Sequence, residues 1–220
     1  MPIPQIAFQN VSYLDGEKTI LKDISFEIYK GDYVSIVGPS GGGKSTLLKL
    51  CCHLISPTQG SIFVNGTNIT QLEPVELRKK ISYCFQTPVL FGKTVRDNLN
   101  YPYLIRNKKM DMERVNALFS KFKMEPDYLN REIGNLSGGE KQRIALIRSL
   151  LFLPDVLLLD EVTSALDVEN TLVVENVILD LNRSGVTVLW ITHNPAQSRK
   201  YAGKLLTIEN GQMKALEELR

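Results

Sequence analysis

One stretch of eight residues constrains the fold of this chain more than any other feature of the sequence. Residues 38–45 read Gly-Pro-Ser-Gly-Gly-Gly-Lys-Ser and match the pattern G-x-x-x-x-G-K-[ST] in full. A nearly continuous apolar strand pattern at 33–37 precedes the stretch, and a helical pattern at 45–54 follows it. Glycines between a strand and a helix let backbone N–H groups surround phosphate oxygens, and the helix N-terminus adds its positive dipole end. The stretch therefore predicts a phosphate-binding loop within an α/β fold.

The side chains of this loop have distinct expected roles. Lys44 is expected to reach the β- and γ-phosphates of a nucleotide, and the Ser45 hydroxyl is expected to ligate Mg²⁺. The other residues expected to bind the nucleotide are Gly38, Ser40, Gly41, Gly42, Gly43 and Thr46.

Strand and helix patterns alternate along most of the chain, as they do in a helix-covered parallel sheet. The apolar runs Val156–Leu159 and Val186–Ile191 are typical of strands buried on both faces. Near the N-terminus, residues 3–8 and 24–28 alternate with period two, which indicates half-buried strands. A helical pattern covers 168–181. These patterns predict a parallel α/β core.

The middle of the chain, residues 87–150, departs from this alternation because it is mostly helical and richer in charge. Within it, residues 111–122 carry apolar side chains three or four positions apart, the spacing of one helix face. We therefore predict a single domain over 1–220, in which 1–86 and 151–220 form the nucleotide-binding core and 87–150 form an inserted helical subdomain.

Composition and charge exclude several classes of protein. The formal net charge is +2, with 23% charged and 43% hydrophobic residues, which is ordinary for a globular chain. This balance argues against a disordered chain and against a basic nucleic-acid-binding arm. No run approaches the ~18 apolar residues of a membrane-spanning helix, and residues 1–10 lack the pattern of an export signal. We expect a cytoplasmic protein with no nucleic-acid partner, which would need a separate membrane-spanning partner to work at a membrane.

The apolar run at 156–159 ends in two carboxylates, Asp160 and Glu161. Asp160 is placed to hold Mg²⁺, and Glu161 could polarise an attacking water. Taken alone, Glu161 is equally consistent with a solvated or helix-capping acid. Together with the phosphate loop, the pair predicts nucleotide hydrolysis.

A second glycine-containing segment, Leu-Ser-Gly-Gly-Glu-Lys-Gln-Arg at 136–143, precedes an apolar helical run. Ser137 and Glu140 have the spacing of a helix capping box. The box does not explain Gly138 and Gly139, because a glycine within a helix costs ~1 kcal/mol relative to alanine. Exposed N–H groups and glycines at a helix start suit an anion, so this segment predicts a second phosphate-binding helix terminus.

In these motifs the chain resembles the ATP-binding cassette (ABC) ATPases, and the resemblance covers nearly the whole chain. It implies a P-loop NTPase with a RecA-like parallel-sheet core, an N-terminal antiparallel β subdomain and an inserted helical subdomain. It also implies a head-to-tail homodimer that forms with ATP. In such a dimer the nucleotide on one chain contacts residues of the other, which here are Ser137, Gly138, Gly139 and Asp167.

Three further positions take their expected roles from this resemblance, and a fourth departs from it. Gln86, which follows the strand pattern 81–85, resembles the Q-loop glutamine, with a part in catalysis and in Mg²⁺ binding. His193, just after the apolar run at 186–191, resembles the switch histidine. Tyr13 resembles the aromatic residue that stacks on adenine. Glu140 stands where many members of the family carry glutamine.

Residues 81–92, 94–99 and 104–107 are also similar to the ATP-binding subunits of a small family of bacterial iron exporters. This similarity implies an ATPase subunit that powers an integral membrane permease docked near residues 86–105. It implies a position on the inner face of the cell membrane. The alternative is a soluble ABC ATPase that assists assembly of a scaffold, as in iron–sulfur cluster biogenesis, and the identity of the partner separates the two.

Overall fold

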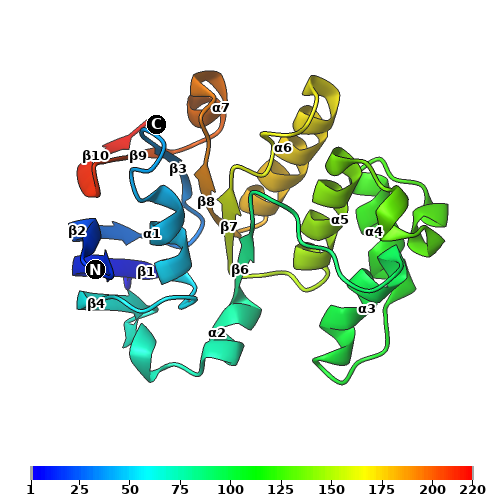
Figure 1. Cartoon of the computed structure of the whole chain (residues 1–220), viewed down its shortest axis with the longest axis horizontal. Coiled ribbons are helices and arrows are strands. Elements are labelled where there is room, and N and C mark those ends of the chain that lie inside the picture. The colour runs from blue at the N-terminus through cyan, green and yellow to red at the C-terminus, as the bar shows by residue number, and fades with distance from the viewer. Residues whose placement is uncertain (1, 220) are drawn as a thin grey trace. The chain divides into compact units, whose positions relative to one another are not determined.

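Two β-sheets and a group of helices make up the computed structural model, which describes residues 2–219 (Figure 1). The strands are β1 (Ile6–Asp15), β2 (Lys18–Ile28), β3 (Tyr33–Val37), β4 (Gln59–Val64), β5 (Thr67–Asn68), β6 (Ile81–Cys84), β7 (Val156–Asp160), β8 (Thr187–Ile191), β9 (Lys204–Glu209) and β10 (Gln212–Glu218). The α-helices are α1 (Lys44–Cys51), α2 (Pro74–Lys80), α3 (Val95–Leu104), α4 (Met112–Lys121), α5 (Gly138–Leu150), α6 (Val168–Arg183) and α7 (Pro195–Lys200). Short 3₁₀ helices cover Ile69–Gln71, Pro126–Asn130 and Ile133–Asn135.

The chain divides into two compact units. The first contains residues up to 83, 154–161 and those from 182 onward, and the second contains 84–153 and 162–181. The predicted division into a core and an insertion at 87–150 stays a prediction. That prediction assigned residues 162–181 to the core, whereas contacts within the chain group these residues with 84–153 in the second unit.

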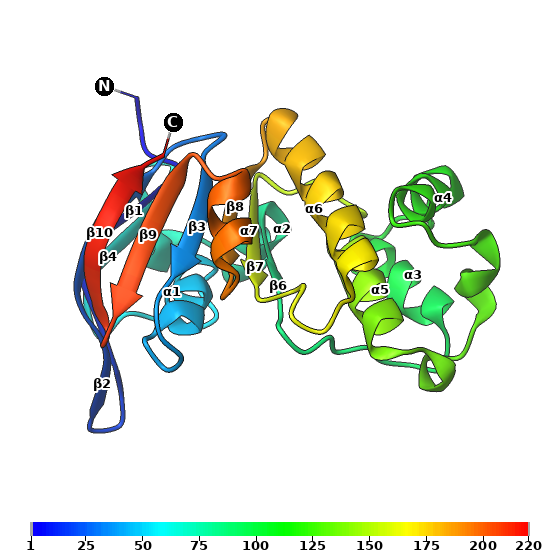
Figure 2. The ribbon, with the colours of Figure 1, turned by 90° about the horizontal axis from the view of Figure 1, so that it is seen from above.

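The larger sheet of the first unit places the ends of several parallel strands along one edge. Its strand order is β10-β9-β3-β8-β7-β6, and the neighbours β9, β3, β8 and β7 are parallel (Figure 2). The strands β7 and β8 are buried at every residue, which explains their continuous apolar sequences. Since parallel strands end at the same edge, the segments that follow β3, β7 and β8 begin close together.

The smaller sheet is antiparallel, with strand order β2-β1-β4-β5. Helix α1 contacts β2 of this sheet and β7 and β8 of the larger one, so it lies between the two sheets. Leu47, Leu48 and Leu50 of α1 are fully buried in a hydrophobic core to which both sheets contribute. This core fixes the beginning of α1 relative to the ends of the parallel strands.

The second unit is helical. Helix α5 contacts both α3 and α4, and each of the three helices buries apolar residues. Val115, Leu118 and Phe119 of α4 are buried as their spacing predicts, whereas Met112 is exposed because it starts the helix. Within residues 2–219, we find no helix with the length and apolar character needed to cross a membrane.

The predicted fold class is confirmed, including the antiparallel N-terminal sheet, the parallel core and the helical unit. The predicted strand at 3–8 begins later, at Ile6, and continues to Asp15 through an irregularity in pairing around Asn10, whose φ is 49°. The strands β9 and β10 were not predicted. They form an antiparallel hairpin connected by Asn210 and Gly211.

Candidate functional site

The phosphate loop connects β3 to α1, as predicted, and three of its glycines, Gly38, Gly41 and Gly43, have backbone conformations that other residues rarely adopt. Gly38 has a φ of 139°, and a Cβ at this position would lie 1.9 Å from the backbone oxygen of Ile208. Gly43 has a φ of 100° and precedes the first residue of α1, where a Cβ would lie 2.6 Å from Leu21 Cδ2. The neighbouring strands thus require glycine at both ends of the loop.

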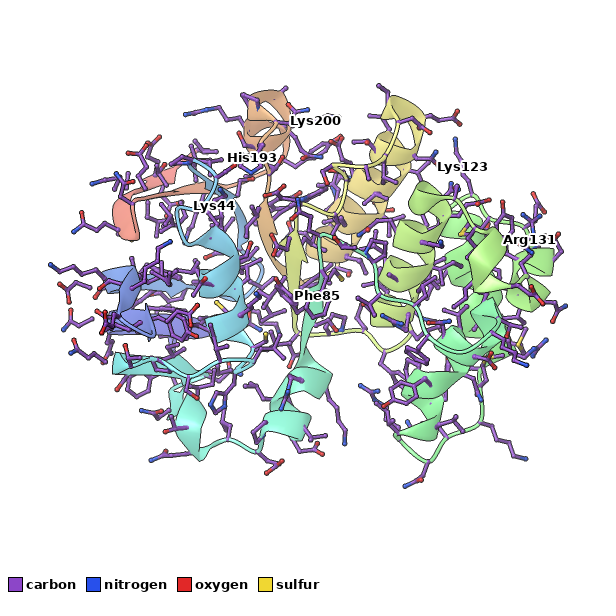
Figure 3. All side chains as sticks on the ribbon, viewed as in Figure 1. Lys44, Phe85, Lys123, Arg131, His193 and Lys200 are labelled. Carbon is purple, nitrogen blue, oxygen red and sulfur yellow. The ribbon has the colours of Figure 1, made fainter. Side chains whose placement is uncertain are left out.

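The side chain of Lys44 lies within the loop and not in solvent (Figure 3). Its Nζ donates hydrogen bonds of 2.9 Å to the carbonyl oxygens of Gly38 and Pro39. Burial lowers the pKa of Lys44, although the carboxylates of Glu161 and Asp160 oppose this shift. The ammonium group of Lys44 is therefore partly desolvated and lies among backbone groups of the loop. A cation in this environment suits a bound phosphate.

Asp160, the last residue of β7, is 5% exposed and accepts a hydrogen bond on each carboxylate oxygen. The Ser45 hydroxyl donates to Oδ1 at 3.0 Å, and the Tyr83 hydroxyl donates to Oδ2 at 2.6 Å. The Ser45 and Asp160 oxygens fit Mg²⁺, which usually takes one or two protein oxygens together with phosphates and water. Residues 2–219 contain no cluster of three His, Cys, Asp or Glu side chains suited to a metal.

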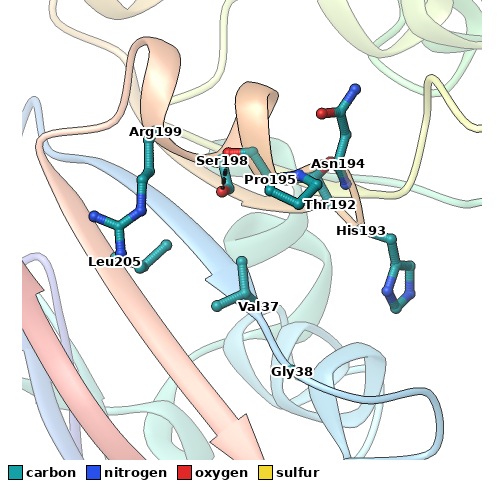
Figure 4. A pocket seen from close by; sticks show the side chains of 9 residues that line it. All are labelled: Val37, Gly38, Thr192, His193, Asn194, Pro195, Ser198, Arg199 and Leu205. Atoms are coloured by element: carbon teal, nitrogen blue, oxygen red, sulfur yellow. Dashed lines mark hydrogen bonds between the residues drawn. The ribbon is translucent and has the colours of Figure 1, made fainter.

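Glu161 and His193 meet just beyond the ends of β7 and β8. His193 Nε2 lies 2.8 Å from Glu161 Oε1, within hydrogen-bond distance. The backbone of Glu161 is left-handed, with a φ of 50°, and its N–H donates to the carbonyl of Ile191 at 3.1 Å. Both His193 and Gly38 line a pocket of about 250 Å³ beside α7 (Figure 4). The acid and the histidine are therefore on the side of the sheet where the phosphate loop begins.

The second glycine segment begins α5 with the predicted capping box. The Ser137 hydroxyl accepts from the Glu140 N–H at 3.3 Å, and Glu140 Oε2 accepts from the Ser137 N–H at 2.7 Å. Glu140 Oε1 also accepts from the Tyr128 hydroxyl at 2.5 Å, and this bond is the main reason why the pKa of Glu140 is lowered. The guanidinium of Arg131 stacks over the Tyr128 ring at 3.6 Å. A glutamate at position 140 thus accepts from two donors at once.

Asp167 caps the start of α6 and is connected to α5. Its two carboxylate oxygens accept from the Asn170 N–H at 2.8 Å and from the Asn170 side-chain amide at 2.7 Å, and these bonds lower the pKa of Asp167. The Asn170 side chain in turn accepts from Arg143 of α5. A Cβ at Gly139 would lie 3.2 Å from Leu166 Cδ2, so the second glycine segment packs against the segment that carries Asp167.

Gln86 and Tyr13 complete the predicted set. Gln86 is exposed, and the carbonyl of the preceding Phe85 accepts from the amide of Gln142 at 3.4 Å. Tyr13 is half-buried on β1 opposite Leu21 of β2, the residue that packs against Gly43.

The structure therefore groups Lys44, Ser45, Asp160, Glu161 and His193 in the first unit. It groups Ser137–Gly139 with Asp167 in the second. Two residues in these groups, Tyr83 and Tyr128, were not predicted.

Comparisons with known proteins agree with this geometry. A family model described as ABC transporter matches residues 21–164. The chain is 45% identical over 207 residues to the "Probable iron export ATP-binding protein FetA" of Escherichia coli (strain K12), covering 94% of this chain and 92% of that protein.

Two solved structures are similar over 98% of the chain, each at 30% identity. One is a dimeric post-hydrolysis state of the ATP-binding cassette MJ0796 bound to ADP and Pi, with a TM-score of 0.88 and 99% of that chain covered. The other is a bacterial Atm1-family ABC exporter with ATP bound, with a TM-score of 0.89 and 39% of that chain covered. The chain therefore belongs to the ABC transporter family, in which it is an ATP-binding subunit that hydrolyses ATP.

Proposed function

We propose that ATP and Mg²⁺ bind at the phosphate loop and that Glu161 is the general base for hydrolysis. Lys44 and the N–H groups at the start of α1 hold the β- and γ-phosphates, and Ser45 and Asp160 provide the oxygens for the metal. Mg²⁺ held there neutralises charge on the phosphates. Gln86 completes this part of the site, and Tyr13 stacks on the adenine.

The bond between His193 and Glu161 is the observation that carries this proposal. Glu161 directly follows Asp160 in the sequence, and the bond orients its carboxylate through the imidazole of His193, which follows the neighbouring strand β8. Glu161 accepts a proton from a water molecule as the water oxygen attacks the γ-phosphorus. The bond from the γ-phosphorus to the β–γ bridging oxygen breaks, and ADP and phosphate are released.

The active form is a head-to-tail homodimer that closes on ATP. Ser137, Gly138 and Gly139 of one chain contact the γ-phosphate held by its partner, and Asp167 lies at the same interface. Two observations support this assembly. The segment is a helix N-terminus with two glycines, and the similar cassette MJ0796 has been solved as a dimer.

The membrane partner docks near residues 86–105. This stretch and the adjoining Phe85 expose several large apolar side chains, which is unusual for a surface without a partner. The exposed residues are Phe85, Val89, Phe91, Tyr101, Leu104 and Ile105. Such a partner holds the chain in the cytoplasm at the inner face of the cell membrane. Similarity to an iron-export ATP-binding protein supports iron as the transported substrate.

The replacement Glu161→Gln tests the catalytic assignment. It keeps the size of the side chain but removes the basic carboxylate, so ATP binding should persist while the turnover rate falls by ~10²–10⁴-fold. Glu113→Gln, the same change at an exposed position on α4 of the second unit, is the matched control and should keep the wild-type rate. Steady-state ATPase assays beside equilibrium ATP binding measure both quantities. A wild-type rate in Glu161→Gln refutes the role of Glu161.

A further inference from the structure

The Tyr83 hydroxyl occupies a position that the mechanism above does not use. Tyr83 lies on β6, the neighbour of β7 in the sheet, and Asp160 is the last residue of β7. The Tyr83 hydroxyl donates to Asp160 Oδ2 at 2.6 Å, while Ser45 donates to Oδ1 at 3.0 Å. The two oxygens of the buried carboxylate thus receive one donor each, from different elements of the fold.

These two donors are not equivalent with respect to a metal. The Ser45 oxygen is itself a proposed ligand, and a hydroxyl that ligates a metal directs its lone pair at the metal and turns its proton elsewhere. Its bond to Oδ1 therefore depends on whether the metal is bound. Tyr83 donates to the other oxygen, so its bond is compatible with either condition. A short bond between a hydroxyl and a carboxylate is also among the stronger hydrogen bonds in proteins.

We propose that Tyr83 is a positioning residue for metal binding, whose hydroxyl fixes the plane of the Asp160 carboxylate so that Oδ1 stays directed at Ser45. The inference rests on the proposed role of Asp160 as a Mg²⁺ ligand. Hydrogen-bond partners of metal ligands commonly change metal affinity by ~10–100-fold when they are removed, which sets the scale of the expected effect.

The test compares Tyr83→Phe with the wild-type chain and with a control, Tyr29→Phe. Tyr83→Phe removes only the hydroxyl and keeps the ring, so the fold should be preserved. The control removes a hydroxyl that donates to Glu27 at 2.5 Å on the exposed surface of the same unit. For each protein, Mn²⁺ is titrated into the chain with a non-hydrolysable ATP analogue, and bound Mn²⁺ is counted by electron paramagnetic resonance. The chain is kept in excess of the analogue. Affinity for the analogue is also measured in EDTA.

We expect the half-saturating Mn²⁺ concentration of Tyr83→Phe to rise by about 10–100-fold, with unchanged affinity for the analogue in EDTA and no change in Tyr29→Phe. An unchanged Mn²⁺ affinity in Tyr83→Phe overturns the inference. An equal loss of affinity in EDTA also overturns it, because Tyr83 would then support the loop and not the metal. The variant Asp160→Asn distinguishes a failure of the role of Tyr83 from a failure of the proposed metal site. If it weakens Mn²⁺ binding while Tyr83→Phe does not, only the role of Tyr83 fails; if it leaves Mn²⁺ binding intact, the proposed metal site fails.

Discussion

The left-handed backbone of Glu161 predicts an order of stability between two variants that both lack the carboxylate. Glu161→Ala and Glu161→Gly remove the same bond to His193, so they differ mainly in backbone freedom. At a φ of 50°, a residue with a Cβ carries a penalty of ~1–2 kcal/mol that glycine avoids. Glycine also has more conformational freedom than alanine in the unfolded chain, which lowers the stability of the folded state by ~0.4–1 kcal/mol. The difference leaves Glu161→Gly more stable than Glu161→Ala by about 1 kcal/mol.

Trp190 provides the assay for this difference. It is the single tryptophan of the sequence, it is 1% exposed, and it lies on β8 beside Leu159 of β7, close to position 161. Its fluorescence during denaturant or thermal unfolding reports the stability of the first unit. For a chain of this size, 1 kcal/mol corresponds to a shift in Tm of ~2–4 °C.

A second pair of variants, at an ordinary strand position, tests the sign of this difference in stability between glycine and alanine. Glu209 ends β9 and is not among the residues with positive φ. There alanine should be more stable than glycine by ~0.5–1 kcal/mol, the reverse of the order at position 161. If Glu161→Ala is as stable as Glu161→Gly, the backbone at position 161 is not strained and this reasoning is refuted. The ATPase rate of both Glu161 variants should fall by ~10²–10⁴-fold, as in Glu161→Gln, because neither supplies a general base.

Three further predictions follow from the same contacts. Gly38→Ala should destabilise the first unit by at least ~1–3 kcal/mol in the same unfolding assay, since the new Cβ would lie 1.9 Å from the Ile208 oxygen and has no room to move. Because burial lowers the pKa of Lys44 while bound phosphates favour its charged form, ATP binding should be accompanied by proton uptake at pH values near and above that lowered pKa. ATP affinity should accordingly fall as the pH rises through the lowered pKa. Calorimetry in buffers of different ionisation enthalpy measures the proton uptake on ATP binding. The absence of proton uptake up to pH 10 contradicts this prediction. In the Glu161→Gln background, ATP should produce dimers that sedimentation detects. Ser137→Ala loses an N-cap worth ~1 kcal/mol and should weaken this dimerisation. Dimers that form equally well without ATP contradict the proposed interface.

The placement of the main site could be predicted because each of its residues follows a strand with an unmistakable sequence. The runs at 33–37, 156–160 and 187–191 are buried over nearly their whole length, and parallel strands of one sheet end at the same edge. Chain order and strand type were therefore enough to bring Lys44, Asp160 and His193 to one edge. The capping box at Ser137 was equally local, since both of its partners lie within four residues.

Contacts between segments distant in the sequence could not be predicted in this way. Tyr83 meets Asp160 only because β6 is placed next to β7, and strand order is not encoded in the pattern of either strand. The hairpin of β9 and β10 is a different case. Its turn, Asn210–Gly211, has positive φ at both residues, and an Asn-Gly pair between apolar runs is the strongest short-range signal of a hairpin. That signal was present in the sequence.

The hydrogen bonds of the site also indicate where the affinity for ATP originates. Lys44 donates to two loop carbonyls, Ser45 donates to Asp160, and His193 is bonded to Glu161. Each of these side chains thus already has a hydrogen-bond partner within the chain, and a hydrogen bond to a charged group contributes only ~1.5–3 kcal/mol net. The larger gain comes from charge, because the phosphates replace carbonyl dipoles around the buried ammonium of Lys44 and beside the N-terminus of α1. Affinity should therefore depend on the number of phosphates far more than on the base, and adenosine alone should bind weakly however well Tyr13 stacks on adenine.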